Sequence, residues 1–167
     1  MRIFGKLDMT TSSLHRWSRA GGRWLLAVLA TTVLGTIVQT QFNLVALVEL
    51  GQQIGPGLWL HTTLLDLVRF APPFAAIVAV GFLVSLPLAS WLTRRKAGRG
   101  WLHPLAGAVA MLVALLLMRW LVGLTPIAAA RTPLGTTALV LSGALGGWVW
   151  GLRAESTGRT KPGASPL

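Results

Sequence analysis

The sequence contains no cysteine and no tyrosine, and acidic residues are scarce. The lack of cysteine excludes disulfides, thiolate catalysis and sulfur-ligated zinc or iron–sulfur centres. Only 11% of the 167 residues are charged, and four of them are Asp or Glu. Soluble domains carry about 25% charged residues. Such a chain cannot cover its surface with polar side chains, so we expect much of that surface to face lipid.

Familiar catalytic motifs are also missing from the sequence. It has no phosphate-binding loop, no zincin motif and no serine nucleophile elbow. The acids Glu49 and Asp66 lie outside the middle of any apolar run, which disfavours an ion-coupled carrier. We therefore expect no cofactor and no metal site.

Long apolar stretches make up much of the remainder, with 53% hydrophobic residues and a mean hydropathy of +0.66. A helix needs about 20 apolar residues to cross a bilayer. Four stretches approach this length and predict an all-α, polytopic membrane protein, a four-helix bundle with spans at about 24–45, 72–92, 104–121 and 134–152. Residues 1–23 form a basic N-terminal segment and residues 153–167 a tail that we expect to be disordered.

The segment between the first two spans, residues 46–71, is predicted to lie on the outer side. Gly55-Pro56-Gly57 interrupts any helix there, and residues 58–70 show the periodicity of a short amphipathic helix. Its apolar side is predicted to hold Leu60, Leu64, Leu67 and Val68, and its polar side Thr62, Asp66 and Arg69.

The distribution of Lys and Arg orients the spans. Twelve of the 15 basic residues lie before the first span, between the second and third, or after the fourth. Loops rich in Lys and Arg stay in the cytoplasm, which predicts that both termini are cytoplasmic. We expect these residues to bind anionic lipid headgroups rather than nucleic acid, because they flank apolar runs. The composition, rich in Arg, Gly, Ala and Leu, is typical of a bacterium and so predicts a bacterial inner membrane.

Small residues recur every four positions in the fourth span, at Gly143, Gly147 and Gly151. This spacing lets helix backbones approach closely. Two interpretations stay open: packing inside the four-helix monomer, or docking of another subunit.

A polar stripe runs along the first span. On a helical wheel, Thr32, Thr36 and Asn43 fall within about 60° of Gln39. Amides are costly against lipid, so we expect the stripe to face the bundle or a partner helix. It provides either interhelical hydrogen bonds or a polar lining for a ligand or ion, for which Gln39 and Asn43 are the candidate residues.

The remaining candidate site lies on the outer side. Asp66 and Arg69 are spaced to pair on one helix. Arg119 lies near the outer end of the third span, where it reaches the interface or pairs with Asp66 or Glu49. Together His61, Arg69, Arg119 and Arg131 are predicted to form an outward-facing basic pocket.

Three functions are compatible with these patterns. The leading hypothesis is a non-enzymatic accessory or assembly subunit that acts through helix–helix association, with a membrane-protein partner or as a homo-oligomer. The second is a small oligomeric transporter or channel that uses the stripe of Gln39 and Asn43. The third is a lipid-binding protein or lipid-modifying enzyme that uses the outer basic pocket.

Overall fold

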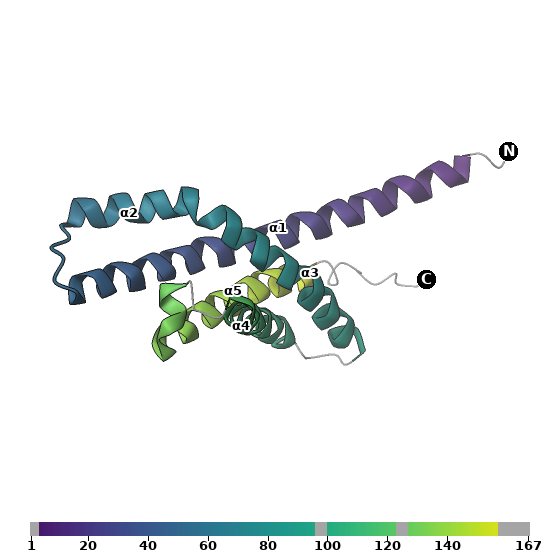
Figure 1. The fold of residues 1–167 in the computed structure, drawn as a ribbon. Helices are drawn as coiled ribbons and strands as arrows, with labels where there is room; N and C mark the ends of the chain where they lie inside the picture. The colour runs from purple at the N-terminus through teal and green to yellow at the C-terminus, as the bar shows by residue number, and fades with distance from the viewer. Residues whose placement is uncertain (1–3, 96–99, 123–126, 157–167) are drawn as a thin grey trace.

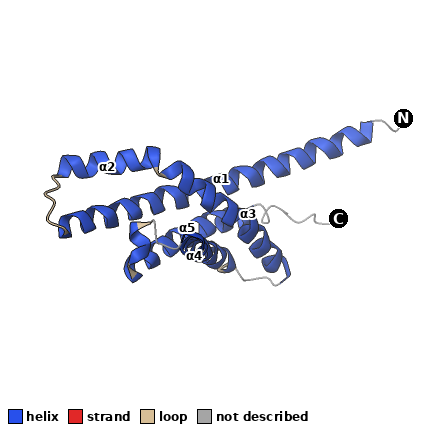
Figure 2. Ribbon diagram, viewed as in Figure 1, coloured by secondary structure: helices blue, strands red, loops and turns tan. Residues whose placement is uncertain are grey.

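The structure, a computed structural model, describes residues 4–95, 100–122 and 127–156, with side chains described for residues 20–93, 100–120 and 127–152. In these ranges the chain is helical apart from short connections, and it contains no strand (Figure 2). The elements are α1 (Phe4–Glu49), α2 (Pro56–Arg69), α3 (Ala71–Arg95), α4 (Leu102–Val122), the 3-10 helix η1 (Ala128–Arg131) and α5 (Pro133–Ser156) (Figure 1).

The predicted all-α class is confirmed, and the element boundaries differ at the two ends of the chain. α1 has 46 residues and continues through the segment that we predicted to precede the first span. No proline interrupts residues 4–49, and the cost of Gly21 and Gly22 in a helix is about 1 kcal/mol each. α5 ends at Ser156, and the rest of the predicted disordered tail lies outside the described residues, as do residues 96–99 of the basic loop.

Three helical stretches of the described chain are long and apolar enough to cross a membrane, which is consistent with a membrane location. They are Ala20–Glu49, Ala71–Thr93 and Leu102–Trp120. α5 is 24 residues long, but glycine, serine and threonine dilute its apolar residues. Its composition alone therefore does not mark it as a membrane crossing.

α5 lies between α1 and α4, and its glycines set the separation of the three helices. On the side of α4, a methyl group at Gly147 would overlap the carbonyl oxygen of His103, and one at Gly143 would lie 2.5 Å from the carbonyl oxygen of Gly107. On the side of α1, a methyl group at Gly146 would overlap the Thr31 hydroxyl. Both small-residue faces of α5 are thus filled by helices of the same chain.

α3 closes the bundle with aromatic side chains. Phe74 and Phe82 are almost fully buried, and Phe82 lies against Gly146. Phe74 sits on Gly35 of α1, where an added methyl group would lie 2.5 Å from the ring. Phe70, at the end of α2, stacks on Phe74 with 5.5 Å between ring centroids. The junction of α2 and α3 is therefore anchored to the middle of α1.

Replacing Gly147 with alanine should destabilise the protein. Alanine is normally favoured over glycine in a helix by about 0.5–1 kcal/mol, but here the new methyl group must push α4 away, and overpacking costs about 1–3 kcal/mol. Gly81→Ala in α3 is the matched control, because its methyl group would make only ordinary van der Waals contacts, 3.6 Å from the Ala110 Cβ and 3.8 Å from the Ala110 carbonyl oxygen. SDS-induced unfolding should show a loss for Gly147→Ala and none for Gly81→Ala; equal effects would refute the packing.

Candidate functional site

The strongest polar contact between helices joins α1 to α2. Thr40 is fully buried, and its hydroxyl lies 2.8 Å from the Asp66 Oδ2 and 2.9 Å from the Thr36 carbonyl oxygen. The hydroxyl has one proton, which it donates between these two acceptors. Asp66 is partly buried and faces α1, so the carboxylate is directed into the protein instead of toward the exposed Arg69.

A second set of hydrogen bonds continues this contact toward the tip of α1 and α2. The Trp59 indole N–H donates to the Gln41 Oε1 at 2.6 Å, and the Gln41 Nε2 donates to the Thr63 hydroxyl at 3.4 Å. Thr63 in turn donates to the Trp59 carbonyl at 2.9 Å. We call the five residues Thr40, Gln41, Trp59, Thr63 and Asp66 the outer polar seam.

The predicted polar stripe of α1 is largely buried. Thr32, Thr36 and Gln39 are 3%, 0% and 8% exposed, so these three face other helices as expected. The Gln39 Oε1 accepts a hydrogen bond from the Ala129 N–H of η1 at 2.9 Å, whereas Asn43, one turn further, is exposed in the single chain. Among the described residues, the Thr32 and Thr36 hydroxyls have no hydrogen-bond partner.

The predicted basic residues are all exposed and lie on three elements. His61 and Arg69 are on α2, Arg119 on α4 and Arg131 on η1. The predicted Asp66–Arg69 pair is wrong, because Asp66 hydrogen-bonds to Thr40, and no ion pair joins these two described residues.

A second polar cluster ties four helices at the opposite end of the bundle. The Trp150 indole N–H donates to the Ser90 hydroxyl at 3.0 Å, and Ser90 donates to the Leu86 carbonyl at 2.8 Å. His103 Nε2 lies 3.4 Å from the same hydroxyl, and the Arg23 guanidinium lies 5.1 Å from the centre of the Trp150 ring. His103 Nδ1 lies 3.3 Å from the Gly100 carbonyl oxygen, so the His103 ring joins the start of α4 to Ser90 of α3.

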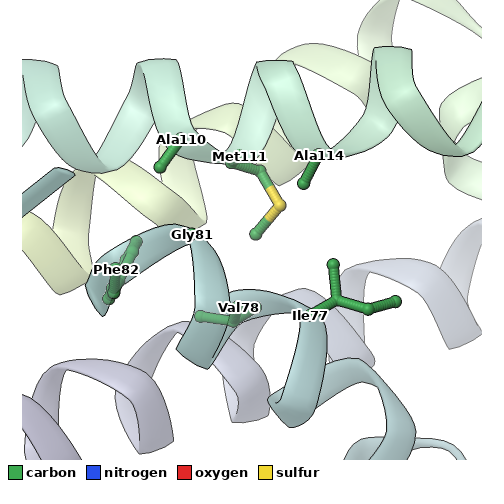
Figure 3. A pocket seen from close by; sticks show the side chains of 7 residues that line it. All are labelled: Ile77, Val78, Gly81, Phe82, Ala110, Met111 and Ala114. Atoms are coloured by element: carbon green, nitrogen blue, oxygen red, sulfur yellow. The ribbon is translucent and has the colours of Figure 1, made fainter. Parts of the chain in front are cut away.

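A shallow apolar notch lies between α3 and α4 near the middle of both helices (Figure 3). It is lined on α3 by Ile77, Val78, Gly81 and Phe82 and on α4 by Ala110, Met111 and Ala114. The seven lining residues are all apolar. The notch has room for little more than one water-sized group, and it offers nothing to orient a polar ligand.

The sequence analysis missed Thr40, Gln41, Trp59 and Thr63, although a signal for the first two was present. Gln39, Thr40 and Gln41 are consecutive, and consecutive residues of a helix point about 100° apart. A polar run of this kind cannot form one stripe and indicates polar neighbours on more than one side. The structure places η1 beside Gln39 and α2 beside Thr40 and Gln41.

Comparison with known proteins adds no relative from which a role could be transferred. Neither a family model, nor a curated protein, nor a solved structure matches the chain. The site is therefore interpreted from its own geometry.

Removing the Thr40 hydroxyl should weaken the outer polar seam. Thr40→Val leaves the Asp66 carboxylate without its donor, and we expect a loss of about 1 kcal/mol in SDS-induced unfolding, in the range found for polar contacts within membranes. On an Asp66→Leu background, the same substitution should have almost no further effect. Thr62→Val is the control, since that hydroxyl bonds only to Leu58 of its own helix. Equal losses for Thr40→Val on both backgrounds would show that the contact is not formed.

Proposed function

We propose that the chain is a four-span protein of a bacterial inner membrane, with α5 as the fourth crossing and both termini in the cytoplasm. The 24 residues of α5 rise about 36 Å, more than the roughly 30 Å of the hydrocarbon core. α5 needs fewer apolar residues than the other spans because α1 and α4 cover it. The distribution of basic residues supports this orientation, with the end that holds Arg23 and Trp150 against anionic cytoplasmic headgroups.

Within this membrane, the proposed role is that of a non-enzymatic accessory or assembly subunit that binds a helix of another membrane protein. The observation that carries the proposal is the notch between α3 and α4. Gly81 on α3 and Ala110 and Ala114 on α4 have small or no side chains, so little projects from the two helices at this point. Small residues spaced by four allow a further helix to approach closely.

The notch differs from the glycine rows of α5 in being unfilled. A methyl group at Gly81 would make only ordinary contacts, whereas the rows of Gly143 and Gly146 are already in contact with α4 and α1. We therefore place the docking surface at the notch, because Gly143, Gly147 and Gly151 pack against α4 of the same chain. The membrane-facing surface beside the notch is apolar, with Val80 69% and Val113 47% exposed.

The cluster of Arg23, Ser90, His103 and Trp150 supports a packing role. Ser90 accepts a hydrogen bond from Trp150 and lies within hydrogen-bonding distance of the Leu86 carbonyl and the His103 ring, so its contacts join α3, α4 and α5.

Filling the notch should prevent association. In membranes of the native host, Gly81→Leu should abolish co-purification of a crosslinked partner, because the longer side chain occupies the space of the docking helix. Val80→Leu is the matched control, since it adds one carbon on the neighbouring lipid-facing position. A second copy of this chain or a different protein in the crosslinked species would both support the proposal. A partner retained in full by Gly81→Leu, or none captured from the unaltered chain, would contradict it.

A transporter or channel is the second candidate, and the buried hydroxyls of Thr32 and Thr36 favour it. A buried hydroxyl without a partner costs about 1–3 kcal/mol, and sites of function are one place where this cost is tolerated. If the stripe lines a path, Gln39→Leu combined with Asn43→Leu should reduce solute flux into proteoliposomes. Unchanged flux of every solute that the unaltered protein carries would eliminate this candidate.

A further inference from the structure

The polarity of α2 is the reverse of that in a helix on the surface of a soluble protein. Its polar groups at Trp59, Thr63 and Asp66 bond to α1. The stripe on its opposite side, formed by Leu60, Leu64 and Val68, is 63%, 56% and 72% exposed, and of the charged or imidazole side chains of α2 only His61, beside the stripe, and Arg69, at the end of the helix, are exposed with it. In water, an amphipathic helix packs its apolar face on the protein and leaves its polar face in solvent. Polar groups turned inward and apolar groups turned outward are what a hydrocarbon solvent requires.

The same arrangement extends along the neighbouring surface of α1 and α3. Val45 and Val48 on α1 are 45% and 44% exposed, and Leu83 and Val84 on α3 are 65% and 69% exposed. α3 is one of the stretches that can cross a membrane. The exposed stripe on α2 thus resembles the exposed apolar surface of α3, a helix able to cross a membrane.

Counting helical residues across the hydrocarbon core also places the lower part of α2 among lipid acyl chains. A hydrocarbon core of about 30 Å takes up about 20 helical residues, so counting from Trp24 it ends near Leu44 of α1. Asp66 is hydrogen-bonded to Thr40, below this level. The paired ends of α1 and α2 extend past η1 and the start of α5 (Figure 1). The tip of the hairpin therefore lies further from the centre of the bundle than the start of α5 does. Arg69 is exposed at the lower end of α2, and an arginine side chain is long enough to place its guanidinium at the headgroups while its methylene groups lie in the hydrocarbon.

We infer that the hairpin formed by residues 41–69 is embedded in the outer leaflet, with the stripe of Leu60, Leu64 and Val68 against lipid acyl chains. Val68 lies deepest and Leu60 nearest the headgroups, while Gln52 and Gln53 at the tip reach water. Trp59 lies at the headgroup level, where indole rings concentrate. The outer polar seam then shields Asp66 from lipid, because the Asp66 side chain faces α1 and accepts a hydrogen bond from Thr40. The occupant of the stripe is lipid, whether or not the notch binds a partner.

Spin labels can test this directly, because the chain has no cysteine to remove. Single substitutions Leu60→Cys, Leu64→Cys and Val68→Cys would be labelled with a nitroxide in the purified full chain and reconstituted in vesicles of phosphatidylethanolamine and phosphatidylglycerol. Accessibility to oxygen, which concentrates in acyl chains, would be compared with accessibility to a water-soluble nickel chelate. Val80→Cys on α3 provides the lipid-facing reference and Gln53→Cys at the tip the aqueous one.

The ratio of oxygen to nickel accessibility should rise from position 60 to 64 to 68 and exceed that at position 53 severalfold, approaching that at position 80. Ratios equal to that at position 53 would place the hairpin in water and overturn the inference. Protection from both reagents would also overturn it, because a second copy of the chain would then cover the stripe. Each labelled variant would first be shown to unfold in SDS as the unaltered chain does, so that misfolded variants are excluded. The comparison of positions 60, 64 and 68 with position 53 does not involve the notch, so its outcome is independent of partner binding.

Discussion

A helix inside a membrane must turn its polar side chains toward another helix, and the arrangement of this chain follows from that requirement. α1 carries consecutive polar residues at Gln39, Thr40 and Gln41, which point to different sides. No single neighbour can satisfy them. η1 supplies a backbone N–H to Gln39, while α2 supplies Asp66 to Thr40 and Trp59 to Gln41. Hydrogen bonds to the polar end of α1 therefore hold α2 in place after the chain turns back.

The glycines of α5 determine how closely its neighbours pack. Gly146 brings α5 against α1, and Gly147 brings it against the backbone of α4, so these two faces of α5 are buried. Another face of α5 carries Leu141, Leu145 and Trp148, which are 58%, 46% and 50% exposed. The apolar windows of α3 and α4 are only 22% and 28% buried and are more hydrophobic than that of α1, which is 44% buried. In these three helices, hydropathy therefore rises with exposure.

The sequence was sufficient for the helical class, for three helices long and apolar enough to cross a membrane, and for the burial of Thr32, Thr36 and Gln39, because each depends on local periodicity. It was insufficient for the partners of these residues. The predicted Asp66–Arg69 pair used the spacing within one helix, and the contact with Thr40 spans 26 positions, which no spacing rule reveals. The predicted basic pocket rests on shared depth alone, and its residues lie on three elements, with His61 and Arg69 on α2, Arg119 on α4 and Arg131 on η1. The row of Gly143, Gly147 and Gly151 was recognised, but the choice between internal packing and docking required knowing which helices lie beside α5.

If α5 crosses the membrane, the chain spans it four times and both ends lie on one side. Labelling of single cysteines with a membrane-impermeant maleimide distinguishes three crossings from four, at Ser12→Cys near the N-terminus, Gln53→Cys at the tip of the hairpin and Ser165→Cys near the C-terminus. In intact spheroplasts, we expect labelling at position 53 alone, with positions 12 and 165 labelled only after lysis. Labelling at both 53 and 165 in intact spheroplasts would show that α5 does not cross the membrane.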